Sequence, residues 1–99
     1  MAFGVKRKEL IEWKHQVQQG NISFLTHYWI DPRFPGCNTV TKVGCTNIDK
    51  LIKWGSQYDL QPNWIHHDPC FPHYDLFGEM QKVVLTQEKQ WNQIKRFNI

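Results

Sequence analysis

The hydrophobic period of this chain changes from helical to strand-like and back, and this change limits its fold more than any other feature. Apolar residues recur at helical spacing over residues 5–19, and Gly20 follows where a helix C-cap glycine is expected. Residues 22–30 carry bulky β-branched and aromatic side chains on both faces, which predicts a covered, central strand. That strand should end at the Asp31-Pro32 pair.

A second strand and a second helix follow, and together they predict a βαβ unit. Residues 39–43 form a short β-branched strand, and Thr46 is expected to cap a helix in which Gly55 allows close packing on the sheet. Residues 63–66 are predicted to form a third strand. A strand, a helix and a strand in this order predict two parallel strands with a right-handed crossover. Asp75 is expected to cap a last helical region.

Length and composition fit one small domain. The 99 residues are 40% hydrophobic and 21% charged, which is close to ordinary globular values and argues against disorder. No apolar stretch approaches the roughly 20 residues of a membrane span, and the first eight residues lack the apolar run of a secretory signal. We therefore predict an α/β fold: a single small domain over residues 1–99, with an about three-stranded sheet, the βαβ unit and helices at both termini.

Charge and cysteine content restrict the compartment and the partners. The net charge of +3 is below that of a dedicated nucleic-acid-binding protein. Basic residues gather near the two ends of the chain, where adjacent terminal helices would form one anion-binding patch or simply remain solvated. Cys37, Cys45 and Cys70 are odd in number and lack a CxxC spacing, so we expect reduced thiols in a cytoplasmic protein.

The histidine-rich residues 66–75 are the densest group of metal-binding side chains. His67, Cys70 and His73 follow a spacing compatible with zinc, and three ligands with an open position are typical of catalytic metal sites. A structural zinc site needs two separated ligand pairs, and only one cluster is visible here. The alternative is a polar loop whose histidines form hydrogen bonds and whose Asp75 caps a helix.

A second interpretation combines this segment with the end of the first strand. If the first and third strands were parallel neighbours, Asp31, His73 and Asp75 would converge at the edge where α/β sheets bind ligands. Two carboxylates and a histidine suit Mg²⁺ or Mn²⁺ and phosphoester chemistry, and Zn²⁺ is a further candidate cation for the chain. Arg33 could hold a phosphate oxygen, and His27 lies near the same strand end. Asp31, His73 and Asp75 are thus the candidate catalytic and metal-binding residues, with His67 and Cys70 as alternative metal ligands.

Two functions remain open at this stage, and a third possibility is a purely structural His73-Tyr74-Asp75 corner. The first is a divalent-metal-dependent phosphoester hydrolase or nuclease-like enzyme. The second is a non-catalytic module that binds a nucleotide, a nucleic acid or a protein through the His73-Tyr74-Asp75 loop and His66. In an extended segment, His73 and Asp75 share one side while Tyr74 faces the core. The five tryptophans lie on or beside apolar stripes and are expected in the core; they are Trp13, Trp29, Trp54, Trp64 and Trp91.

Several motifs resemble a known group of bacterial proteins. The runs are Leu25-Thr-His-Tyr-Trp29, Asp31-Pro-Arg-Phe-Pro35 and Thr41-Lys-Val-Gly-Cys45, and they are similar to the YneQ-like small uncharacterised bacterial proteins. The runs Trp64-Ile65-His66 and Pro72-His73-Tyr74-Asp75 also resemble the signature of a related bacterial domain of unknown function. These resemblances imply no activity. They mark Asp31, Trp64, His73, Tyr74 and Asp75 as pattern-bearing positions, and they do not include Cys70 or His67.

Overall fold

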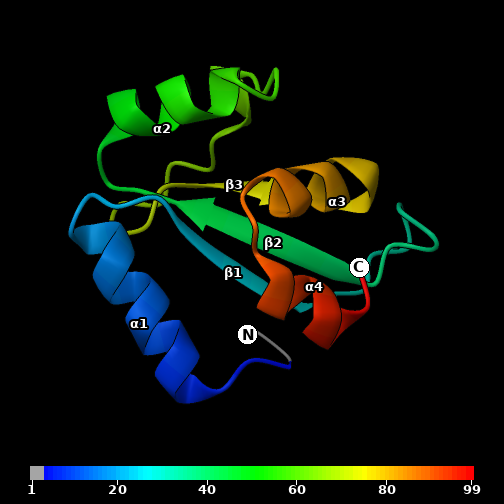
Figure 1. Ribbon diagram of the computed structural model, residues 1–99. Coiled ribbons are helices and arrows are strands. Elements are labelled where there is room, and N and C mark those ends of the chain that lie inside the picture. Colours follow the sequence, from blue (N-terminus) through cyan, green and yellow to red (C-terminus); the bar gives the residue numbers. More distant parts are fainter. Residues whose placement is uncertain (1–3) are drawn as a thin grey trace.

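The computed structural model describes residues 4–99, which form helices packed on both sides of one three-stranded sheet (Figure 1). The helices are α1 (Arg7–Gln18), α2 (Ile48–Ser56), α3 (Gly78–Gln87) and α4 (Trp91–Phe97), with a 3₁₀ helix η1 (Pro62–Trp64). The strands are β1 (Ser23–Tyr28), β2 (Thr39–Gly44) and β3 (His73–Leu76). The α/β class, the three-stranded sheet and the helices near both ends are confirmed.

The end of α1 follows from its glycine. Gly20 adopts a φ of +81°, a left-handed conformation that costs glycine little. The Gly20 amide donates to the Val17 carbonyl and the Asn21 amide donates to the Gln16 carbonyl, both at 3.1 Å. This pair of bonds is a Schellman motif, which satisfies the last carbonyls of the helix and turns the chain into β1.

The sheet is antiparallel throughout, so the predicted βαβ unit is wrong. The strand order is β1-β2-β3, which places β2 at the centre and makes β1 an edge strand instead of the predicted central one. Residues 63–66 are not a strand, because Pro62 begins the 3₁₀ helix η1. Proline suits the first position of a helix, since its φ is already helical and the N–H that it lacks would be unpaired there. The third strand lies later in the chain, at His73–Leu76, and returns beside β2 without a parallel crossover.

Two predicted helix caps have other roles. Asn47, and not Thr46, caps α2, since its side chain accepts a hydrogen bond from the Lys50 amide at 3.1 Å. The Thr46 hydroxyl donates instead to the Val17 carbonyl at 2.9 Å, which ties the start of α2 to the end of α1. Asp75 lies within β3 and does not cap a helix; α3 begins only at Gly78.

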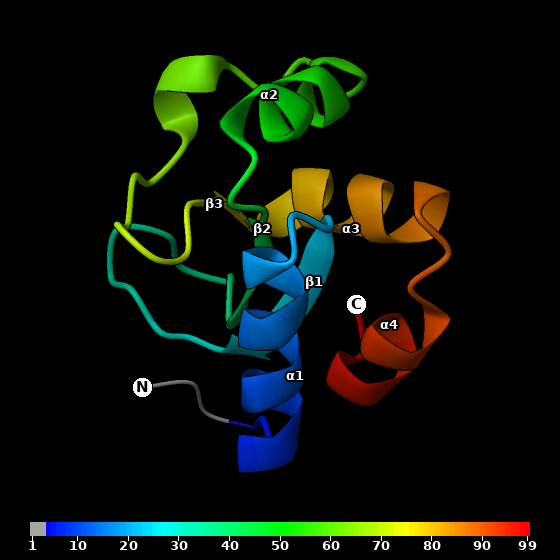
Figure 2. The ribbon, with the colours of Figure 1, turned by 90° about the vertical axis from the view of Figure 1, so that its left-hand side faces the viewer.

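The two faces of the sheet are covered unequally. On the first, the covered face, helices α2, α3 and α4 pack over alternate strand residues, including Val43, Tyr74 and Leu76. On the second, the open face, α1 covers only part of the sheet, with Trp13 and Val17 packed against Leu25. Figure 2 shows α3 and α4 on one side of the sheet, and the 29–38 and 65–72 connections on the other.

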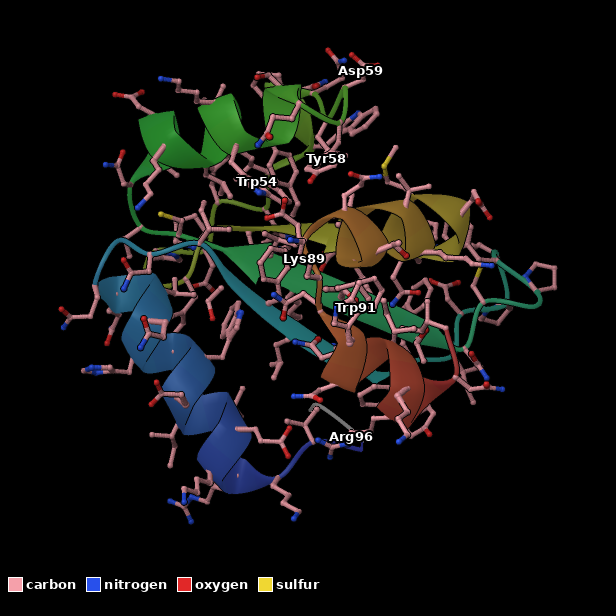
Figure 3. All side chains as sticks on the ribbon, in the orientation of Figure 1. Trp54, Tyr58, Asp59, Lys89, Trp91 and Arg96 are labelled. Carbon is pink, nitrogen blue, oxygen red and sulfur yellow. The ribbon has the colours of Figure 1, made fainter. Side chains whose placement is uncertain are left out.

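Glycine and tyrosine join α2 to the covered face. A Cβ atom at Gly55 would lie 2.8 Å from the Tyr74 hydroxyl oxygen and 2.9 Å from a ring carbon, so only glycine permits this approach. The predicted close packing of Gly55 on the sheet is therefore confirmed. Trp54 in α2 and Tyr58, which follows α2, project toward the end of α3 (Figure 3). Both donate hydrogen bonds to the Glu88 carboxylate, at 3.0 and 2.5 Å.

A chain of hydrogen-bonded side chains crosses the covered face beneath α3 and α4. Its members, in order, are Thr39, Gln81, Thr41, Thr26 and Gln93. Thr26 uses its only proton toward Gln93 at 2.5 Å, so Thr41 must be the donor in the 2.7 Å contact between the two threonines. Thr41 also accepts from the Gln81 amide at 3.0 Å, so its hydroxyl links both halves of the chain.

The first and last helices are tied together by an ion pair. The cysteines, by contrast, form no bond with one another in the described residues. An ion pair between Arg96 and Glu9 joins α4 to α1 at 2.5 Å. Cys37, Cys45 and Cys70 are all free thiols. Within residues 4–99, every helix is too short or too polar to cross a lipid bilayer.

The substitution Thr41→Val should lower the free energy of unfolding by about 1–3 kcal/mol, because it leaves buried polar partners unsatisfied. Urea unfolding followed by circular dichroism measures this loss. Thr86→Val is the matched control: the Thr86 hydroxyl donates to the Lys82 carbonyl on an exposed helix surface, and its loss should change stability by less than about 0.5 kcal/mol. Equal losses in the two variants would contradict the role assigned to the buried chain.

Candidate functional site

A cleft of about 890 Å³ lies on the open face of the sheet. The strands supply its floor, which consists of Leu25, His27, Val40, Lys42, His73 and Asp75. Helix α1, the two connections and Phe77 after β3 supply its walls. The wall residues of α1 and the connections are Leu10, Trp13, Lys14, Trp29, Arg33, Phe34, Asp68, Cys70 and Phe71. Its volume falls in the range of roughly 300–1,000 Å³ that is typical of small-molecule sites.

The pairing of β3 with β2 decides which side chains enter the cleft. His73 lies opposite Gly44, and Asp75 lies opposite Lys42. Because alternate residues of a strand share a face, His73 and Asp75 point together into the cleft while Tyr74 points into the core. Tyr74 is only 1% exposed, so it anchors the strand and does not contact a ligand in the cleft.

His66 joins His73 and Asp75 in one cluster. Two backbone hydrogen bonds of 2.7 and 3.1 Å pair His66 with His73, and their imidazole rings are stacked at a centroid distance of 5.2 Å. One ligand atom from each of His66, His73 and Asp75 lies within 4.8 Å of the other two. These three residues are called the histidine–aspartate cluster below. Among residues 4–99, this is the one grouping of three or more potential metal ligands.

The ring of His73 is held in a defined orientation. Its Nδ1 contacts the Phe71 carbonyl at 2.7 Å and must donate there, because a carbonyl only accepts. Its Nε2 therefore faces Asp75, at 3.4 Å from the nearer carboxylate oxygen. Burial lowers the pKa of His73, but the contacts with Asp75 and the Phe71 carbonyl outweigh it, and the pKa of His73 lies above its ordinary value. Burial raises the pKa of Asp75, but the hydrogen bond and the charge of His73 outweigh burial. The pKa of Asp75 therefore lies below its ordinary value.

Asp31 does not join this cluster. Its carboxylate is held by Arg33, through the side-chain Nη2 at 2.5 Å and the backbone amide at 2.9 Å, and it does not line the cleft. The Arg33 contact also holds the pKa of Asp31 below its usual range. The expected convergence assumed that the first and third strands are neighbours, whereas β2 separates β1 from β3. Arg33 itself reaches the rim of the cleft.

The alternative metal ligands and two tryptophans are exposed. His67 and Cys70 both face solvent, and neither belongs to the histidine–aspartate cluster, although Cys70 lies on the cleft wall. The expectation that all five tryptophans lie in the core is wrong for Trp29, which is half-buried on the cleft wall. It is also wrong for Trp64 in η1 and Trp91 in α4, which are each 56% exposed. Polar flanking residues place both on solvent-facing sides of short helices.

Lys42 is a site residue that the sequence interpretation missed. It lies in the central strand, between Leu25 on β1 and Asp75 on β3, at the middle of the cleft floor. Its positive charge acts on His27, His73 and Asp75. The sequence feature that could have identified Lys42 is that it is the single cation in an otherwise uncharged, β-branched strand. Its side chain lies on the same face of the sheet as those of His27 and Asp75.

His27 has a buried nitrogen with no hydrogen-bond partner in the protein. The side chain is only 6% exposed. Its Nδ1 must donate to the Tyr28 carbonyl at 2.9 Å, so Nε2 carries the lone pair of a neutral ring. Nε2 is buried without a protein partner. Burial is the largest influence on His27 and lowers its pKa, which favours this neutral form.

Fold and cleft together define a small α/β protein with one concave site on a partly open sheet face. By sequence, the chain belongs to the YneQ family of small bacterial proteins. It is 56% identical to the uncharacterized protein YneQ of Bacillus subtilis (strain 168), and the match covers all 99 residues and the full length of that protein. No family model matches the chain. No solved structure matches it either.

The two buried histidines of the cleft should titrate on opposite sides of pH 6.5. His27 has a lowered pKa, so its contribution to stability is complete above pH 6.5 and is lost as the pH falls through its folded pKa. His73 has a raised pKa, so its contribution is complete below pH 6.5 and is lost as the pH rises through its folded pKa. Ring-proton chemical shifts followed by NMR measure both midpoints, and a midpoint of His27 above that of His73 would refute this assignment.

Proposed function

We propose that the cleft binds a divalent metal ion through His66, His73 and Asp75, and that the protein is a metal-dependent phosphoester hydrolase. The histidine–aspartate cluster carries this proposal, since one ligand atom from each of its three residues lies within 4.8 Å of the other two. His73 and Asp75 lie on the cleft floor, and the exposed His66 is bridged to His73 beside it. Three protein ligands leave a coordination position for water or substrate, which is the arrangement of catalytic metal sites.

The donor set favours a transition metal. Imidazole nitrogen with carboxylate oxygen suits Zn²⁺ or Mn²⁺, whereas Mg²⁺ prefers oxygen ligands and retained waters. His73 also has the support that metal-binding histidines require, because its Nδ1–H donates to the Phe71 carbonyl and leaves Nε2 free to bind. Among Zn²⁺, Mn²⁺ and Mg²⁺, we therefore expect Zn²⁺ to bind most tightly, with Mn²⁺ next.

The residues around the cluster suit an anionic substrate. Lys42 lies beside Asp75 on the floor, and Lys14 and Arg33 lie on the walls. An ammonium group at the position of Lys42 would bind a phosphate oxygen and stabilise the charge that develops there. The metal ion would lower the pKa of a bound water to about 7. Attack of that water on phosphorus would break the phosphorus–oxygen ester bond; the water would give up a proton and the leaving oxygen would take one up, so that one water would be consumed per ester.

A phosphate-containing small molecule fits the cleft better than a nucleic acid does. The cleft is bounded on three sides by α1 and the two connections, and the net charge of the chain is only +3. The alternative is a non-catalytic module that binds the same ligand. Such a module would use the same cleft residues as the enzyme, so only a measurement of turnover distinguishes the two functions. We keep the cytoplasm as the predicted compartment, since free thiols persist under reducing conditions.

The adjacent pair His66 and His67 offers a matched test of metal binding. Both are exposed, and only His66 belongs to the cluster. Zn²⁺ at a hundredfold excess over its dissociation constant should stabilise the parent by about 2.7 kcal/mol in a thermal melt. His66→Ala should abolish most of this stabilisation, and His67→Ala should retain it.

Turnover of bis(4-nitrophenyl) phosphate, with and without EDTA, tests the catalytic half of the proposal. Zn²⁺-dependent hydrolysis that is lost in His66→Ala and kept in His67→Ala is the expected result. Stabilisation by Zn²⁺ without turnover of this diester or of nucleotides would favour the binding module. An equal response of both variants to Zn²⁺ would place the metal elsewhere and overturn the proposal.

A further inference from the structure

One end of the cleft lies away from the histidine–aspartate cluster and has a different chemistry. It is formed by His27 and Val40 on the floor and by the side chains of Trp29, Phe34 and Phe77 on the wall. These three aromatic rings pack together with centroid distances of 4.6 to 5.9 Å, and all three remain partly exposed. The group of Trp29, Phe34 and Phe77 is called the aromatic wall below.

His27 adds a specific polar requirement to this apolar end. Only 6% of His27 is exposed to solvent. Its Nε2 is buried and has no hydrogen-bond partner in the protein. Because Nδ1 is committed to the Tyr28 carbonyl, the neutral ring presents Nε2 as an acceptor only. A buried acceptor is costly to leave unpaired, so a ligand at this end is favoured if it brings an N–H or O–H donor.

The sheet register sets the separation between the two ends. Asp75 lies opposite Lys42, and Lys42 lies opposite Leu25, which is two residues before His27. A strand spacing of about 4.8 Å and a rise of about 3.4 Å per residue then separate the Cα atoms of His27 and Asp75 by roughly 12 Å. Lys42 lies between them, so a ligand that spans the cleft would pass over its ammonium group.

We infer that the cleft takes a nucleoside phosphate, with its base against the aromatic wall, a base N–H donated to Nε2 of His27, and its phosphate at Lys42 and the histidine–aspartate cluster. This inference rests on the proposed function for the position of the phosphate. The base end rests on its own observations. Planar bases stack on aromatic side chains, and each of the four common bases carries an N–H donor. A free sugar phosphate has hydroxyl donors for His27 but no planar ring to stack on the aromatic wall.

Isothermal titration calorimetry of the full chain tests the base end directly. The probes are AMP, GMP, CMP and UMP, with ribose 5-phosphate as the ligand that lacks a base and purine riboside 5′-monophosphate as the ligand whose base lacks an N–H. Titrations in EDTA examine the base end alone, and titrations with Zn²⁺ include the cluster. Failure of the metal site would therefore leave the preference for bases measurable in EDTA.

At least one of the four nucleotides should bind tenfold or more tightly than ribose 5-phosphate, in EDTA as well as in Zn²⁺. If AMP is the preferred nucleotide, purine riboside 5′-monophosphate should lose about tenfold relative to it. His27→Leu should reduce the preference of the bound nucleotide over ribose 5-phosphate by a similar factor, while His15→Leu, on the exposed surface of α1, should not.

The variant is expected to fold, because leucine replaces a buried side chain that lies beside Leu25 and Val40 and has an unpaired nitrogen. The comparison of ligands on the unmodified protein needs no variant at all. Equal binding of ribose 5-phosphate and all four nucleotides, or no binding of any of them in either condition, would overturn the inference.

Discussion

The antiparallel register between β2 and β3 is the constraint on which the rest of the structure depends. It pairs Gly44 with His73 and Lys42 with Asp75. A slip of one residue would turn every side chain of β3 to the other face, placing a histidine and an aspartate in the core and a tyrosine in the cleft. Tyr74 prevents that slip, since its ring fills the space that Gly55 leaves open on α2.

The unequal covering of the sheet explains why a site exists at all. Three helices and a hydrogen-bonded chain of threonine and glutamine side chains cover most of one face. The other face receives only α1, which leaves a row of polar side chains under partial cover. Partial cover buries most of His73 and His27, while both residues still line the cleft. Such half-buried, charge-coupled groups are typical of functional sites, whereas a solvated surface leaves pKa values near their ordinary ones.

Patterns of local sequence predicted the first half of the fold well. Helical spacing with Gly20 located α1, alternation located β1 and β2, and the packing role of Gly55 followed from its place on the apolar stripe of α2. The third strand was missed because β3 has four residues, three of them ionisable, and its stability comes from pairing with β2 and from Tyr74. Such a strand is a product of tertiary contacts, which a local pattern does not encode.

The candidate site was predicted in part for the same reason. His73 and Asp75 were found because the spacing of two residues places them on one side of any extended segment. Asp31 was included on the assumption of parallel neighbouring strands, and the antiparallel order removes it. The geometric partner, His66, depends on a bridge between residues 66 and 73 around a turn that Asp68 holds by accepting two backbone hydrogen bonds. Lys42 becomes a site residue only once β2 is known to be the central strand.

Anomalous diffraction at the zinc edge, from crystals soaked in Zn²⁺, tests the central claim most directly. The account predicts one strong peak on the open face of the sheet, about 2.0–2.2 Å from an imidazole nitrogen of His66, an imidazole nitrogen of His73 and a carboxylate oxygen of Asp75. A peak bound by His67 and Cys70, or no peak at the histidine–aspartate cluster at a saturating zinc concentration, would contradict it.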